Sequence, residues 1–456
     1  SVAGAQAQQP AGAVPGGADR TRTTAEAAPA DTSAAGRVPA ISTQPPLGIQ
    51  YIRPVDQRGI NMFESPKRAG ATYTGFKLDW SAAFTQQFQA LEHSNSAAER
   101  IVNDATGNPY NANQLLDIGW GFNLATANIG INAQLAPGVR VALESYMSSR
   151  HHNEFWVKGG YLQIDESPID LPVLHAIMEY VTIKAGMFEL NYGDAHFRRS
   201  DNGNAMFNPF VENNILDSFN TEIGAEIYFR TGPWLAMAGV TDGVNKGGVN
   251  VPDQRGPAFL GKVGFDQQLS PDLRVRLTGS LYTVDKTPSN NLYNGDRTGS
   301  RYYSVMENTV STLSGNFTSG RLNPGFTNQI TAFQINPFVR LGGLELFGVV
   351  ERAEGKNRAE DDTRTWTQYA GEAVYRFLPR EQLYIGGRYN TAFGKLRNVP
   401  DEASVDRIAV ASGWFLTPSI LVKAEYVNQK YNDFPAADIR RGGKFDGFMV
   451  EGVIAF

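Results

Sequence analysis

Hydrophobic and polar residues alternate with a period of two along most of the chain from Tyr73 onward. In residues 76–88, apolar side chains occupy nearly every second position, with Lys, Asp, Ser, Thr and Gln between them. Adjacent side chains of a β-strand point to opposite faces, so this pattern predicts strands with one apolar and one polar face. The pattern returns in residues 274–281, 408–416 and 420–426. Apolar-faced segments of roughly nine to eleven residues match the length of a tilted transmembrane strand.

Sixteen such segments are expected. They are residues 73–91, 122–135, 139–149, 154–164, 180–191, 220–229, 234–241, 258–268, 273–284, 329–340, 344–352, 364–377, 383–393, 404–416, 420–428 and 446–456. Short turns, four with a proline and one with Gly342-Gly343, alternate with longer polar connections, of which residues 285–328 form the longest. An even strand number, with short turns at one end and long loops at the other, predicts an all-β transmembrane antiparallel β-barrel. The short turns would be periplasmic and the long loops extracellular.

Composition excludes several other classes of protein. The 456 residues include no cysteine, which excludes a disulfide framework, a thiolate nucleophile and a zinc finger. The formal net charge of −5 argues against a nucleic-acid partner. The longest apolar stretch, residues 171–183, is interrupted by His175 and Glu179 and falls short of the roughly 20 residues of a membrane helix. The mean hydropathy of −0.31 fits a barrel, because the polar residues that face the lumen cancel the apolar residues that face lipid in any average.

The N-terminal part differs from the rest in composition. Ala, Pro, Gly, Ser and Thr dominate residues 1–46, which carry too little apolar surface to offset the entropy of ordering. We therefore expect residues 1–72 to be a flexible N-terminal segment and residues 73–456 to be the barrel. The segment could hang in the periplasm or contact an envelope partner.

Two segments carry motifs. Residues 186–193, Gly-Met-Phe-Glu-Leu-Asn-Tyr-Gly, resemble the strand end before the third loop of general and phosphate-selective porins. The alternating segment that ends at Phe456 resembles the signal for barrel assembly in bacterial outer-membrane proteins. The chain thus resembles the phosphate-selective porin (O/P-like) superfamily. This resemblance implies that residues 193–219 fold into the lumen and narrow the pore, and that the protein is a homotrimer.

Charged residues of the predicted constriction and lumen are the candidate site. The constriction residues are Asp194, His196, Arg198, Arg199, Asp201 and Glu212, and the lumen charges are Lys184, Arg274, Arg276, Arg388, Arg407, Lys423 and Glu425. Arg198 and Arg199 form either the cationic side of the pore or a pin that holds the loop to the wall through carboxylates. Because inward cations and carboxylates are mixed, phosphate selectivity is not expected.

The expected function is passive conduction of small hydrophilic solutes or ions across the outer membrane of a Gram-negative bacterium. Lipid and lipopolysaccharide would surround such a barrel. The alternative is a structural or accessory barrel that anchors an envelope or surface partner. An enzyme is not expected, because the five histidines are scattered and no nucleophile elbow, phosphate loop or metal-ligand cluster is present. No cofactor is expected.

Overall fold

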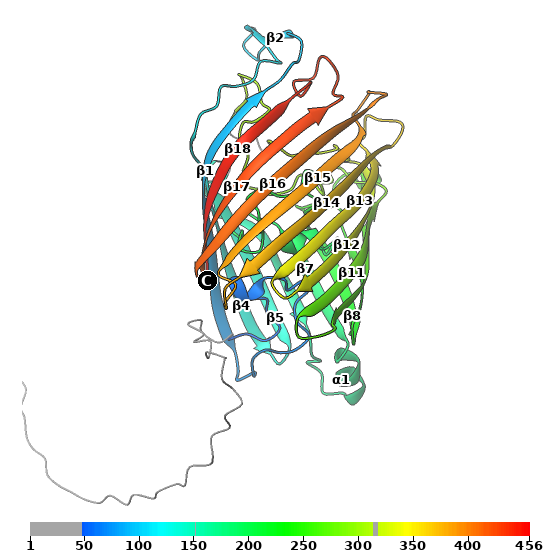
Figure 1. The fold of residues 1–456 in the computed structure, drawn as a ribbon. Coiled ribbons are helices and arrows are strands. Elements are labelled where there is room, and N and C mark those ends of the chain that lie inside the picture. The colour runs from blue at the N-terminus through cyan, green and yellow to red at the C-terminus, as the bar shows by residue number, and fades with distance from the viewer. Residues whose placement is uncertain (1–47, 151, 313–317) are drawn as a thin grey trace, which may run out of the picture. The chain divides into compact units, whose positions relative to one another are not determined.

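The computed structural model describes residues 48–150, 152–312 and 318–456. Sixteen strands close into one antiparallel barrel, in which each strand pairs with its neighbours in sequence and β1 pairs with β18 (Figure 1). The barrel strands are β1 (Lys77–Ser94), β4 (Gly121–Ala136), β5 (Val139–Ser148), β6 (Trp156–Ile164), β7 (Val181–Glu189), β8 (Thr221–Thr231), β9 (Trp234–Thr241), β10 (Ala258–Gln268), β11 (Leu273–Val284), β12 (Gln329–Leu341), β13 (Leu344–Lys356), β14 (Arg364–Phe377), β15 (Leu383–Lys395), β16 (Glu402–Thr417), β17 (Ile420–Asn432) and β18 (Lys444–Ala455). The predicted fold class is confirmed.

The connections alternate between the two ends of the barrel. Tight turns join β4 to β5, β8 to β9, β10 to β11, β12 to β13, β14 to β15 and β16 to β17, whereas the other end carries longer loops. One of these loops includes a small hairpin of β2 (Ile101–Asn103) and β3 (Pro109–Asn111). The short-turn end also carries the helix α1 (Pro172–Met178), between β6 and β7. In the described residues, no helix is long and apolar enough to span a membrane.

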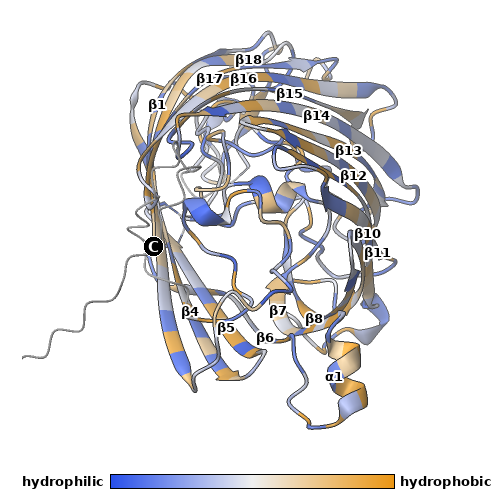
Figure 2. Cartoon of the chain, turned by 60° about the horizontal axis from the view of Figure 1, so that its bottom comes forward, coloured by the Kyte–Doolittle hydropathy of each residue, from blue (hydrophilic) through white to orange (hydrophobic). Residues whose placement is uncertain are grey.

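The strands separate their side chains into two faces. Along β16, Ile408 and Val410 are exposed, whereas Ala409 and Ala411 between them are buried. In β18, the exposed Phe448 and Val450 flank a fully buried Met449. Since the sheet is closed, the buried positions face the interior and the exposed apolar positions form the outer surface. The hydropathy colouring of Figure 2 shows this alternation of apolar and polar residues along the strands.

The core lies where inward side chains meet two of the long connections. Tyr282 and Trp366 of the wall pack with Ile215 of the β7–β8 connection and with Leu292 and Tyr302 of the β11–β12 connection. All five are buried. The core therefore consists of strand residues and loop residues in contact, and the two connections depend on each other as well as on the wall.

Residues 48–72 differ from the expected flexible segment. Ile49 and Phe63 are buried, and Phe63 packs edge-on against Phe338 of β12, with ring centroids 5.3 Å apart. The Gln50 backbone donates to Gln134 of β4 at 2.9 Å. The composition of residues 48–72 does not predict their ordered structure, because that structure depends on contacts with residues that lie far away in the sequence. The expectation for residues 1–47 lies outside the described residues.

Candidate functional site

The connection after β7, residues 190–220, is tied to several strands of the barrel wall. Lys423 of β17 donates to three backbone carbonyls within residues 205–210, at 2.9 to 3.2 Å. Glu425, also on β17, accepts from the backbone N–H of Val211 at 2.8 Å. Gly203 donates its N–H to Asn128 of β4, three strands along the closed sheet from β17, at 2.6 Å. Side chains of the barrel wall therefore make the hydrogen bonds that the backbone groups of a short exposed loop make with water.

Asp194 is the centre of a charged cluster at the start of this connection. Its carboxylate accepts from Arg276 of β11 at 2.8 and 2.9 Å and lies 2.7 Å from Lys262 of β10. Glu64, from the N-terminal part, contacts the same Arg276 at 2.9 Å and the same Lys262 at 3.2 Å. Burial alone would raise the pKa of Asp194, but the two cations outweigh it and hold this pKa below its ordinary value.

Arg198 is neutralised by carboxylates of the wall. Its guanidinium lies 3.3 Å from Glu345 of β13 and 3.5 Å from Glu372 of β14, and it also donates to Asn61. Glu345 is shared with Arg376 at 2.7 Å. The Arg198 side chain is only 3% exposed, so these contacts match the pinning role considered for it.

Arg199 makes a two-point ion pair within its own connection. It donates to both carboxylate oxygens of Asp217, at 2.9 and 2.7 Å. Its guanidinium carbon lies 3.9 Å from the centroid of the Phe219 ring. Asp217 also accepts from Arg321 at 2.7 Å. Asp201, the next carboxylate along, pairs with Lys158 of β6. The pair of Arg199 and Asp217 therefore stabilises the connection from within, and Lys158 binds it to the wall.

His196 is buried beside a carboxylate. Its Nδ1 lies 2.5 Å from Glu189 at the end of β7, and its Nε2 lies 3.1 Å from Asn191. Burial lowers the pKa of His196 below its ordinary value, against the opposite influence of Glu189. The two ring nitrogens hold this part of the connection to Glu189 and Asn191.

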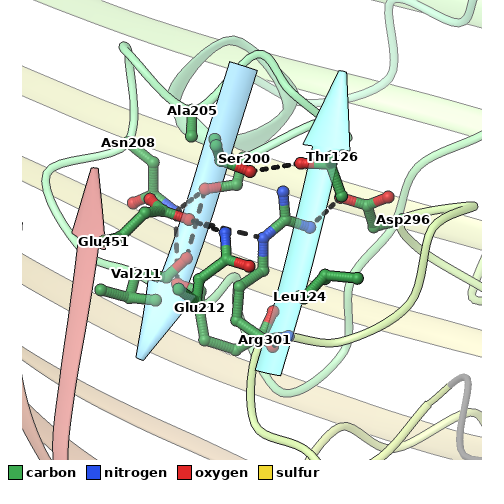
Figure 3. Close-up of polar contacts among 12 residues, drawn as sticks. Leu124, Thr126, Ser200, Ala205, Asn208, Val211, Glu212, Asp296, Arg301 and Glu451 are labelled. Atoms are coloured by element: carbon green, nitrogen blue, oxygen red, sulfur yellow. Dashed lines mark hydrogen bonds and ion pairs between the residues drawn. The ribbon is translucent and has the colours of Figure 1, made fainter. Parts of the chain in front are cut away.

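Glu212 reaches a second connection, the longest of the predicted polar loops. Its carboxylate accepts from the backbone N–H groups of Arg301 at 2.6 Å and Tyr302 at 3.3 Å. Figure 3 shows Glu212 beside Arg301. Both residues belong to residues 285–328, between β11 and β12. Tyr302 also donates to Glu425 of β17. Residues 285–328 are therefore bound between the first connection and the wall.

Several buried contacts hold this second connection. Asp296 pairs with Arg301, and Asp296 also accepts from the backbone of Asn202 at 2.8 Å. The Leu322 N–H donates to the Ile215 carbonyl at 2.9 Å. The polar composition of residues 285–328 resembles that of an exposed loop, and no local pattern shows its partners. The signal available in the sequence was its length of 44 residues.

The predicted lumen charges all lie on the inward face, each with a defined neighbour. Arg388 pairs with Glu372 at 2.8 Å and Lys423 with Glu451 of β18 at 2.6 Å. Arg274 pairs with Asp266 at 2.7 Å, Lys184 lies 3.9 Å from Glu226, and Arg407 donates to the Asn213 carbonyl at 2.6 Å. The interior is thus a network of mixed sign, as the sequence indicated.

Two carboxylates that were not among the predicted site residues are more accessible than the arginines. The side chains of Glu144 on β5 and Glu189 on β7 are each 32% exposed, compared with 3% for Arg198 and 4% for Arg199. Glu144 accepts from Asn204 of the first connection at 2.9 Å. Water-accessible charge beside this connection is therefore partly acidic. Within the described ranges, no group of three or more His, Asp or Glu is placed to hold a metal ion.

Comparisons with known proteins give a fold. No family model matches the sequence, and no curated protein matches it. The outer membrane channel DcaP of Acinetobacter baumannii is similar with a TM-score of 0.51 and 10% identity, over 84% of this chain and 99% of that one. An anion-selective porin from Comamonas acidovorans has a TM-score of 0.49 and 12% identity, over 84% and 100% of the two chains. The chain has the closed 16-stranded barrel fold of outer-membrane channels.

Proposed function

We propose that this chain is a porin of a Gram-negative outer membrane that passively conducts small hydrophilic solutes or ions. One observation carries the proposal: the inward face of the closed barrel is polar and charged, and the outward face between those positions is apolar. A polar lumen holds water, and an apolar outer band meets lipid. Electrodiffusion through such a lumen needs no cofactor and no energy input.

The proposed constriction is residues 193–219, folded into the lumen. Its support is the set of contacts from Lys423 and Glu425 of β17 and, across the closed sheet, from Lys262 of β10 and Arg276 of β11. In this proposal, ion pairs of Arg198 and Arg199 with carboxylates fix the constriction in place. The accessible carboxylates of Glu144 and Glu189 attract passing cations. Phosphate selectivity is not part of the proposal, because the cations of the interior are interleaved with carboxylates.

The partners proposed here follow from a porin role. Outer-membrane lipid and lipopolysaccharide would surround the barrel, and small hydrophilic solutes would pass through it. A homotrimer is proposed from the resemblance to porins. A periplasmic or envelope partner would reach the protein through the N-terminal segment.

The deciding experiment measures ion conductance of the purified protein in planar lipid bilayers. We expect stepwise increases in current, as each inserted barrel adds a fixed conductance, and protein that inserts without conducting would overturn the porin proposal. Replacing both Glu144 and Glu189 with Gln should shift the reversal potential in a salt gradient towards anions. The matched double variant, Arg198→Ala with Arg199→Ala, should instead enlarge the conductance, because the constriction loses its anchors.

One observation favours the alternative of an accessory barrel. Residues 48–72 and residues 285–328 both contact the same connection, the first through Glu64 and Phe63 and the second through Arg301 and Arg321. Such filling leaves less room for solute. In the accessory role, the protein would insert into bilayers, carry no current, and bind an envelope partner.

A further inference from the structure

The helix α1 lies outside the barrel wall at its short-turn end (Figures 1 and 2). It lies within the 16-residue connection, residues 165–180, that joins β6 to β7, where most neighbouring turns have only two to five residues. Pro172 occupies the first turn, where its missing N–H costs no hydrogen bond. A tight turn would suffice to join these strands, so the helix needs another explanation.

The helix divides its side chains into three stripes. Residues four apart lie on one face of a helix. Leu174 and Met178 form the first stripe, half-buried and buried respectively. Val173 and Ile177 form the second, with 63% and 49% of their surface exposed. His175 and Glu179 form the third stripe, which is polar and exposed. An apolar stripe thus lies open beside the stripe that faces the protein.

The open stripe continues into exposed aromatic residues of the wall. Tyr180, which follows the helix, stacks on Phe229 of β8 with ring centroids 6.0 Å apart. On the next strands, the exposed Trp234 packs against Phe265, 5.2 Å apart. All four residues lie at the short-turn ends of their strands or next to them. Aromatic side chains at strand ends form the girdle of a membrane barrel at the lipid headgroups.

We propose that α1 is an interfacial anchor whose Val173–Ile177 stripe inserts into the lipid of the leaflet at the short-turn end. The inference rests on the proposed membrane location but not on conduction. A short helix with one apolar and one charged face binds at the boundary between headgroups and acyl chains. The continuity of its apolar stripe with Tyr180 and Phe229 selects lipid as the occupant, because those rings lie on the outer wall of the barrel.

The test uses single cysteines, which the chain allows because it has none of its own. Val173→Cys and Ile177→Cys variants, each labelled with an environment-sensitive fluorophore, are inserted into phosphatidylcholine vesicles. We expect blue-shifted emission at both positions and severalfold stronger quenching by nitroxide-labelled lipid than by aqueous iodide. The matched variant Glu179→Cys, on the polar stripe, should show the reverse order.

A further variant separates failure of the anchor from failure of the membrane location. Ile408→Cys carries the label on the outer face of β16, where the native side chain is 53% exposed. If nitroxide lipid quenches the label at 408 but not those at 173 and 177, the anchor is wrong and the barrel is still in lipid. If the label at 408 escapes quenching, the membrane location itself fails. Labels at 173 and 177 that are shielded from both quenchers would show contact with a second copy, which also overturns the proposal.

Discussion

Two arginines of β11 lie two residues apart on one face but differ in burial. The Arg276 side chain is 3% exposed and contacts the carboxylates of Asp194, Glu64 and Asp266, whereas Arg274 is 24% exposed and forms an ion pair with Asp266. Removing one partner of a buried pair leaves an uncompensated charge, so Arg276→Ala should lower the free energy of unfolding by about 3 kcal/mol. Arg274→Ala should lower it by about 1 kcal/mol or less. Denaturant titration of the folded protein in vesicles measures both, and equal losses would contradict the argument.

Protonation of His196 should couple stability to pH. Burial lowers the pKa of this imidazole, so between its folded pKa and about 6.5 the unfolded chain binds a proton that the folded chain does not. The stability that the neutral imidazole contributes is present above that window and is lost as the pH falls through it. His196→Gln should therefore flatten the decline of unfolding free energy below about pH 6.5.

The control for this pH dependence is another histidine of the same chain. His175 on α1 has a side chain that is 51% exposed, so His175→Gln is the same substitution at an exposed site. Unfolding midpoints measured at a series of pH values compare the two variants with the native chain. Parallel profiles for the native chain and His196→Gln would rule out the assigned role of burial.

At the scale of elements, the strands and the connections differ in how far the sequence predicts them. Alternation with period two is a local signal, and the observed strands begin and end within a few residues of the expected ones. The partners of residues 285–328 lie on strands and loops more than eighty residues away in several cases, as with Glu212 and Arg301. No window of sequence contains both members of such a pair. The same reason explains why residues 48–72 looked flexible.

The residues of the proposed constriction show the same division. Their identities followed from a motif at the end of β7, and the structure brings Asp194, Arg198 and Glu212 against buried partners. Those partners, among them Glu64 and Arg301, come from segments that carry no motif. The accessibility of Glu144 and Glu189 was not predicted, because exposure is a property of the folded interior. The sequence shows whether a side chain is acidic or basic, but it does not show how much of that side chain is exposed to water.

The connection 285–328 should limit conductance. Its buried contacts with Ile215 and Asp217 fill part of the interior beside the first connection. Replacing residues 288–326 by a short Gly/Ser turn should therefore raise single-channel conductance in planar bilayers. The control shortens residues 357–363, an exposed loop between β13 and β14, and should leave conductance unchanged. Unchanged conductance in both variants would contradict a filling role.

At the scale of the whole molecule, three segments that are distant in sequence meet inside one closed wall. They are residues 48–72, 190–220 and 285–328. Asn61 and Glu64 of the N-terminal part contact the charges that hold the first connection, and Phe63 lies 5.9 Å from Phe197 of that connection. All sixteen strands lie within residues 77–455, so a chain that begins at residue 73 retains the complete wall.

Such a shortened chain should form the barrel but hold its constriction less firmly. Loss of Glu64 leaves Lys262 and Arg276 with less compensating charge, and loss of Asn61 and Phe63 removes contacts of Arg198 and Phe197. We expect a larger and noisier single-channel conductance than that of the full chain. A chain that begins at residue 48 keeps these contacts and should conduct like the full chain. If the two shortened chains conduct alike, residues 48–72 do not restrain the constriction, and the wall alone sets the size of the pore.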